Sequence, residues 1–261
     1  MLLQLLLFEN FQGFYVMANY VEGNIVSQSY VHVDPKWLSN VSAEEREQRI
    51  NKIKKDITDF AESRIPFFIG KDVNIEVEFI EGSIIAKITS YGKMAPLLIA
   101  CTSPAIINYP EYRAGVKEVL RDVQALGQYI NSEVLFQTNT KLKSERKSVE
   151  ARLGVFGTAD RINGKINELI EYTSGNNRSV SITYNKVLEL HSEILTSLDK
   201  IDKDAIDDSD SKLATEMWID GVNRINMGKL QFKLQNKADE ITYNLMITEK
   251  DNLLKNLNDR L

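Results

Sequence analysis

Proline is missing from most of this chain. All five prolines lie within the first 110 residues, and the remaining residues contain none. Because proline removes a helix hydrogen bond and clashes with the preceding turn, the long proline-free stretch can form helices. The strands and turns are expected in the front part. The sequence predicts an α+β fold, in which N-terminal β-hairpins with helices precede a mainly helical C-terminal half with a long terminal helix.

Cysteine and histidine are scarce. The single cysteine, Cys101, excludes an internal disulfide and a cysteine zinc site, and it suits the reducing cytoplasm. The two histidines, His32 and His191, lie far apart, and no His-Glu-x-x-His motif is present. We therefore expect a cytoplasmic protein without a metal site or cofactor. Cys101 is interpreted as a small buried residue, and His191 as a core residue or one that sets helix register.

Positive charge is in slight deficit. The chain has 32 Lys and Arg against 37 Asp and Glu, a net charge of −5, which disfavours binding to nucleic acid or anionic lipid through bulk charge. The leucine-rich start and the apolar segment 94–108 make a membrane-docked effector an alternative that we do not favour. The latter is shorter than the roughly 18–20 residues of a spanning helix. We interpret it as a buried helix.

Two segments alternate as strands do. Residues 14–33 alternate around a turn at Gly23, which predicts a β-hairpin. Apolar and polar residues also alternate over 73–80, and after a Glu-Gly-Ser turn the residues 84–88 return as a partner strand. The sequence thus predicts two hairpins.

A helix is predicted between these hairpins. Ser42 and Glu45 have the spacing of a capping box, in which the serine accepts from the helix amides and the glutamate reaches back to the cap. Apolar residues then recur at helical spacing over about 43–64, until Pro66 is expected to end the helix.

The second half divides at a polar stretch. A helix is expected to end near Phe136, and the segment 138–158 carries many lysines and arginines. We predict an α+β domain over 1–137, a linker over 138–158, and a helical bundle or coiled-coil-like domain over 159–261. The basic linker residues are more typical of a solvated surface than of a nucleic-acid site, because aromatic residues are lacking.

The last predicted helix is too long for a small domain to cover. It runs over about 211–259, roughly 70 Å if unbroken, and Gly221 and Gly228 can bend it. An uneven coiled coil and a folded-back helical hairpin both remain open. Uncovered apolar stripes are usually buried by another chain. We therefore expect a homo-oligomer or a protein partner, bound through apolar residues of this helix: Trp218, Val222, Ile225, Leu230, Leu234, Ile241 and Leu245.

One constellation suggests catalysis. Glu76 and Glu78 project from one face of a predicted strand, and Lys87 lies on its partner strand. The set resembles part of a metal-dependent nuclease core, but the usual Glu-x-Lys spacing on one strand is missing. An unrecognised metal-dependent hydrolase or nuclease is the second alternative.

A weak resemblance covers residues 77–157. The strand followed by Glu81-Gly82-Ser83, the run Tyr112-Arg113-Ala114-Gly115 and the turn Arg152-Leu153-Gly154-Val155 are similar to a pattern in an uncharacterised bacterial protein family. The resemblance implies a bacterial cytosolic protein and brings no activity or catalytic residues. The leading hypothesis remains a non-enzymatic protein that self-assembles or binds a partner.

Overall fold

The chain forms two compact units. The structure, a computed structural model, describes residues 16–18, 24–70, 74–80, 83–101, 108–204 and 206–261. The first unit comprises residues 1–20, 25–92 and 120–154, and the second comprises 21–24, 93–119 and 155–261. Strands and helices are both present, so the predicted α+β class is confirmed.

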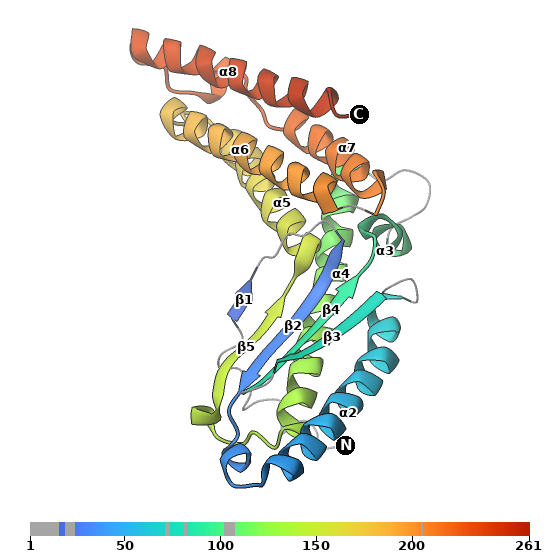
Figure 1. Ribbon diagram of the computed structural model, residues 1–261. Coiled ribbons are helices and arrows are strands. Elements are labelled where there is room, and N and C mark those ends of the chain that lie inside the picture. The colour runs from blue at the N-terminus through green and yellow to red at the C-terminus, as the bar shows by residue number, and fades with distance from the viewer. Residues whose placement is uncertain (1–15, 19–23, 71–73, 81–82, 102–107, 205) are drawn as a thin grey trace, which may run out of the picture. The chain divides into compact units, whose positions relative to one another are not determined.

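The first unit is a sheet with helices on one face (Figure 1). Strands β2 (Ile25–Val33), β3 (Asn74–Ile80), β4 (Ile84–Tyr91) and β5 (Arg146–Arg152) pair antiparallel in the order β5-β2-β4-β3. β1 (Val16–Ala18) pairs with β5 in parallel. α2 (Ala43–Ile69) connects β2 to β3, and α4 (Tyr109–Gln137) precedes β5. This β-α-β-β-α-β order is the split βαβ connectivity of ferredoxin-like units.

The sheet buries one face against these helices. Ile84, Ala86 and Ile88 alternate along β4 and are buried, as expected for a strand with one face on a core. α4 lies very close to the sheet at Gly127, where an added Cβ would lie 2.8 Å from the Cβ of Ala151. A glycine is needed there because a larger residue would separate the helix from β5.

α2 begins as predicted and ends later. Ser42 Oγ accepts a hydrogen bond from the Glu45 N–H at 3.2 Å, which confirms the cap. The Glu45 carboxylate binds Arg49 at 2.6 Å and does not reach back to the cap. The predicted stop at Pro66 is wrong, because α2 continues to Ile69. Proline removes a single hydrogen bond, and so near its end the helix can continue for one more turn.

Two predictions about the sheet are corrected. Among the described residues of 14–33, β1 and β2 do not pair with each other as the predicted hairpin requires: β2 pairs with β4 and β5, and β1 pairs with β5. Most of the predicted turn lies outside the described residues. The predicted linker over 138–158 contains β5, and so the discontinuous units differ from the predicted domains. In both cases the strand partners are distant in sequence. The second hairpin is confirmed by β3 and β4.

The second unit is helical. It contains α3 (Met94–Cys101), the first part of α4, most of α5 (Gly154–Thr173), α6 (Val180–Asp204), α7 (Ser209–Asn223) and α8 (Lys237–Asn258). α6 and α8 run in parallel, because His191 contacts Glu249 and, farther along α6, Asp202 contacts Arg260 just beyond the end of α8 (Figure 1). α3 confirms the start of the predicted apolar helix, whereas residues 102–107 and the Cys101 side chain lie outside the described residues.

The predicted helix over 211–259 is in fact two helices. Residues 224–236 form a loop that includes the short 3-10 helix η4 (Lys229–Gln231). Arg178 pairs with this loop through backbone hydrogen bonds to Gln231 and Lys233. The side chain of Asn236 caps α8 by accepting from the Asp239 N–H at 3.0 Å. Caps and tertiary contacts thus override helix propensity in a segment without proline, and the folded-back alternative is the one observed.

Candidate interaction surface

The seven predicted interaction residues separate into a buried and an exposed group. Trp218, Val222 and Ile225, in and just after α7, are buried. Trp218 Nε1–H donates to Asn163 Oδ1 of α5 at 3.1 Å. Their predicted role at a partner interface is therefore corrected. α7 ends where the loop begins, and the apolar side of α7 packs against other helices of the same unit.

The other four residues reach the surface. Leu230 is 90% exposed, Ile241 53% and Leu245 48%, and Leu234 is half-buried. We name Leu230, Leu234, Ile241 and Leu245 the α8 patch. Exposed single apolar residues are common on proteins, but a cluster of large ones is typical of an interaction site.

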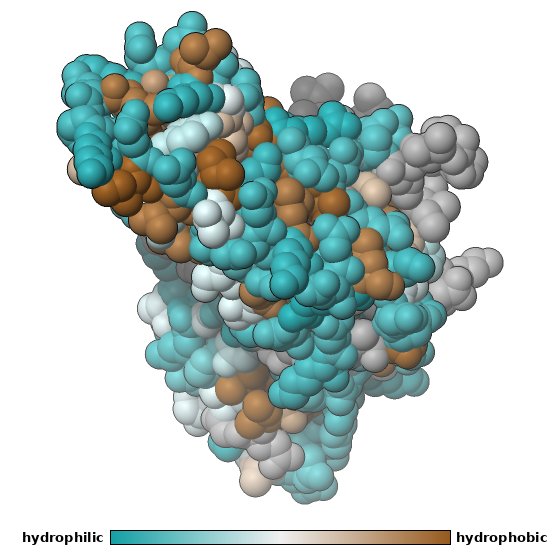
Figure 2. All heavy atoms as spheres, turned by 90° about the horizontal axis from the view of Figure 1, so that it is seen from above, coloured by the Kyte–Doolittle hydropathy of each residue, from teal (hydrophilic) through white to brown (hydrophobic). Residues whose placement is uncertain are grey.

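The residues around η4 lie along the first half of α8. Lys229 Nζ and Glu240 Oε1 are 3.9 Å apart, and the ring centroids of Phe232 and Tyr243 are 5.7 Å apart. Figure 2 shows hydrophobic atoms gathered over the side where α8 begins. These contacts hold η4 beside the first half of α8, so the residues of the α8 patch come from two neighbouring segments.

The spacing along α8 explains why part of its apolar surface stays exposed. Met246, Leu253 and Leu257 are fully buried and mark the side that faces the unit. Leu245 precedes Met246 by one position, about 100° around the helix, and Ile241 lies one turn earlier. Apolar residues thus occupy two sides of α8, and only one side is covered.

α8 is held in place by polar contacts. The Tyr243 hydroxyl donates to the Met227 carbonyl at 2.7 Å, and Lys250 Nζ donates to the Ile225 carbonyl at 2.9 Å. Burial lowers the pKa of Lys250. His191 of α6 is half-buried and contacts the carboxylate of Glu249, so it lies between α6 and α8. Ile241 and Leu245 are therefore presented by an anchored helix.

Both signs of charge surround the α8 patch. Lys233 and Lys237 are exposed, and Lys229 approaches the carboxylate of Glu240. Asp239 accepts from the Gln235 N–H at 2.8 Å. A surface with mixed charges of this kind can match a second copy of itself, because cations of one copy can approach anions of the other.

The predicted catalytic candidates lie on the polar face of the sheet. Glu78 is directly opposite Lys87 and pairs with it at 3.2 Å. The Tyr91 hydroxyl donates to Glu76 at 2.8 Å, and burial together with Glu76 raises the pKa of Tyr91 to about 12. No group of three or more potential metal ligands occurs among the described residues. Each carboxylate has a protein partner, and their role in catalysis stays a prediction.

The same sheet face continues as a network of satisfied polar groups. Arg152 donates to Glu150 at 2.9 Å and to Gln28 at 2.8 Å. Gln28 donates in turn to Thr89 at 2.9 Å, and the guanidinium of Arg152 lies 5.1 Å from the ring centroid of Tyr30. Arg152, which was predicted as part of a solvated basic linker, therefore joins β5 to β2.

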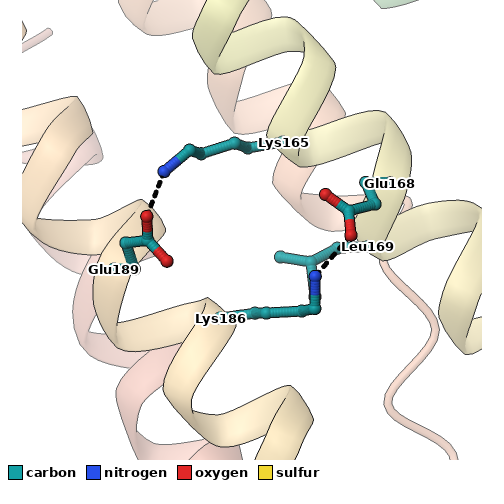
Figure 3. Close-up of a pocket in the computed structure, with 5 residues that line it drawn as sticks. All are labelled: Lys165, Glu168, Leu169, Lys186 and Glu189. Atoms are coloured by element: carbon teal, nitrogen blue, oxygen red, sulfur yellow. Dashed lines mark hydrogen bonds and ion pairs between the residues drawn. The ribbon is translucent and has the colours of Figure 1, made fainter.

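A hollow of about 150 Å³ lies between α5 and α6 (Figure 3). Lys165 binds the carboxylates of Glu189 and, at 2.6 Å, Glu193, and Lys186 binds Glu168. Burial acts to lower the pKa of Lys165, but the two carboxylates outweigh it and raise the pKa. These ion pairs join α5 to α6. Because Lys165 and Lys186 are already paired, the hollow is poorly suited to an anionic ligand.

One buried carboxylate was missed in the sequence. Asp210 ends a stretch rich in aspartate, residues 202–210. It is nevertheless buried and accepts from the N–H groups of Met94 and Ala95 at 2.7 and 2.8 Å. It thus caps α3 from α7. Burial raises its pKa, which these two hydrogen bonds oppose. The long sequence separation hid this contact.

The comparisons with known proteins give no relative. No protein-family model, no curated protein and no solved structure matches the chain. The resemblance over residues 77–157 stays a prediction. Among the helices in the described part of the chain, none is both long enough and apolar enough to cross a membrane.

Proposed function

We propose that this protein is a non-enzymatic assembly protein whose copies associate through the α8 patch. The observation that carries the proposal is the exposure of Ile241 and Leu245 on an anchored helix, together with Leu230 in η4. Covering these side chains removes apolar area from water, worth about 25 cal/mol per Å². Because α8 is already positioned, little further ordering is needed on association.

A second copy of this chain suits the surface better than a strongly charged partner. A two-fold axis passing near the middle of the patch places Ile241 of one copy against Leu245 of the other, with the reciprocal contact on the other side of the axis. The mixed charges around the patch then meet a surface of the same composition. A partner of one dominant charge would meet like charges somewhere on it.

The size of the patch limits the strength of the association. Stable interfaces usually cover about 800 Å² on each partner, and four apolar side chains supply only part of that area. We therefore expect a reversible dimer whose population depends on concentration. A cytoplasmic location, where the single cysteine can stay reduced, belongs to the same proposal.

The test is the absolute mass of the full chain, measured by size-exclusion light scattering from low-micromolar to sub-millimolar concentration. The wild-type mass is expected to rise toward twice the monomer mass. The double variant Ile241→Asp/Leu245→Asp should remain monomeric at every concentration, because charged groups would be desolvated in the contact. Circular dichroism checks that the variant keeps its helices.

Ile206→Asp provides the matched control. Ile206 is 55% exposed, similar to Ile241, but it lies in the loop before α7 and outside the α8 patch. This variant should dimerise like the wild type. A wild-type protein that stays monomeric throughout would contradict the proposal, and so would a control variant that loses assembly to the same extent as the double variant.

A further inference from the structure

A second hollow, of about 200 Å³, lies in the first unit. It is formed where the short 3-10 helix η2 (Lys36–Ser39), α2 and the C-terminal end of α4 meet. The residues that form this hollow are distant in sequence, so no local sequence motif predicted it. Its lining residues are Trp37, Arg49, Lys52, Ile53, Asp56, Gln137 and Asn139.

An oriented indole forms one wall of the hollow. Trp37 is half-buried, and its Nε1–H donates to the Thr138 carbonyl at 2.8 Å. The Arg49 guanidinium lies 5.6 Å from the ring centroid and also pairs with Glu45. The guanidinium lies over the ring, and the indole N–H is already satisfied, so the indole offers a ligand only the part of its apolar ring surface that Arg49 leaves open and no further donor.

Polar side chains without partners surround this ring. Lys52, Asp56 and Asn139 line the hollow, and in the described part of the chain no hydrogen bond or ion pair engages their side chains. Asn139 is held in the left-handed region, with φ of 52°, at the end of α4. The three side chains together offer an ammonium donor, a carboxylate acceptor and an amide with both functions.

We propose that this hollow binds a single sugar ring. A pyranose has one face of C–H groups, which can lie on an indole, and a rim of hydroxyls, which both donate and accept hydrogen bonds. The volume is below the roughly 300–1,000 Å³ of pockets for drug-sized ligands, which suits one ring and is too small for a nucleotide. Lys52 and Asp56 line the hollow with opposite charges, and Arg49 already pairs with Glu45, so the hollow has no excess positive charge to attract a phosphate.

The two tryptophans of the chain make a direct test. In ¹⁵N–¹H spectra of the full-length protein, Trp37 and Trp218 give separate indole signals. D-glucose, D-galactose and N-acetyl-D-glucosamine are added up to high-millimolar concentration. The Trp37 signal should shift saturably with at least one of them, and the signal of the fully buried Trp218 should not move.

Two variants remove the polar groups without disturbing the backbone. Asp56→Ala retains a good helix former within α2, and Asn139→Gly retains a residue that adopts positive φ readily. Each should weaken the sugar affinity by about tenfold, equivalent to about 1.4 kcal/mol. Asp59→Ala, an exposed position of α2 outside the hollow, should leave the affinity unchanged.

Mannitol separates a ring site from general polyol effects, since it has the hydroxyls of a hexose but no ring. It should not produce a saturable shift. The proposal is overturned if none of the sugars shifts Trp37, if mannitol shifts it equally, if both indoles move together, or if the two variants bind as the wild type does.

Discussion

α7 and α8 are consecutive helices with similar apolar stripes and opposite outcomes. The apolar side of α7 is closed within the unit, where Trp218 reaches Asn163 and a Cβ at Gly221 would lie 2.7 Å from the ring of Tyr109. α8 buries Met246 and its neighbours but leaves Ile241 and Leu245 half exposed. An apolar stripe on a helix therefore predicts that other residues cover it. How the rest of the chain packs determines how much apolar surface stays exposed for another molecule.

The largest expected effect on stability comes from truncating a side chain on the buried side of α7. Trp218→Ala should lower the free energy of unfolding by about 3–5 kcal/mol, because it leaves a cavity and an unpaired Asn163 oxygen. Leu230→Ala, at the open side, should change it by less than about 0.5 kcal/mol. Urea denaturation of both variants measures the contrast. Equal losses would mean that α7 and α8 do not differ as described.

A smaller effect concerns the start of α7. Asp210→Asn should cost about 1–3 kcal/mol, because an amide has one oxygen for the two N–H groups of Met94 and Ala95. The start of α8 is exposed by contrast, and Asn236→Ala there should cost about 1 kcal/mol for a lost cap. Both costs are measured by urea denaturation at pH 7.

The pH dependence separates two neighbouring carboxylates. Burial raises the pKa of Asp210, so its contribution to stability is full below the unfolded value near 4 and is lost as the pH rises through the raised value. The hydrogen bonds from Lys93 and then Ser209 lower the pKa of Asp207 to about 2. Its contribution is present above about 4 and is lost as the pH falls toward 2.

The cost of Asp210→Asn should therefore be greater near pH 4 than near pH 7. The cost of Asp207→Asn should instead become smaller as the pH falls from about 4 toward 2. Denaturation of the wild type and both variants across this range tests the two signs, since the other titrating groups cancel in the differences. Costs that change with pH in the same direction would contradict the assignment.

The smallest effect distinguishes two buried tyrosines of α4 in the helical unit. The Tyr109 hydroxyl donates to the Asn163 carbonyl at 3.0 Å, whereas the Tyr112 hydroxyl is buried without a hydrogen-bond partner in the described structure. Tyr109→Phe should cost about 1 kcal/mol, and Tyr112→Phe should be neutral or slightly stabilising. Thermal denaturation compares the two. A larger loss for Tyr112→Phe would indicate that its hydroxyl has a partner.

Local patterns in the sequence predicted the elements whose structure depends on local interactions. Helical periodicity found α2, and alternation found the β3–β4 hairpin. β5 was missed because its sequence, Arg146 to Arg152, is rich in charge and its pairing partners in β2 are far away. The interruption between α7 and α8 was missed as a break because it depends on Arg178 and on the cap at Asn236.

The candidate sites show the same limit. Apolar periodicity identified the residues of the α8 patch but could not separate them from Trp218 and its neighbours, because burial depends on packing between helices. The hollow at Trp37 joins residues about a hundred positions apart, and its shape could not be inferred from either segment. The sequence indicated the side-chain chemistry, and the tertiary structure determined which groups meet.

The close approach of α4 to β5 also has an evolutionary consequence. The space between Gly127 and Ala151 holds one methyl group, that of Ala151. A Cβ added at Gly127 would lie only 2.8 Å from the Ala151 Cβ. The two positions are therefore constrained as a pair. Homologues that keep this packing should have one methyl group between them, so that alanine at the helix position is accompanied by glycine on the strand.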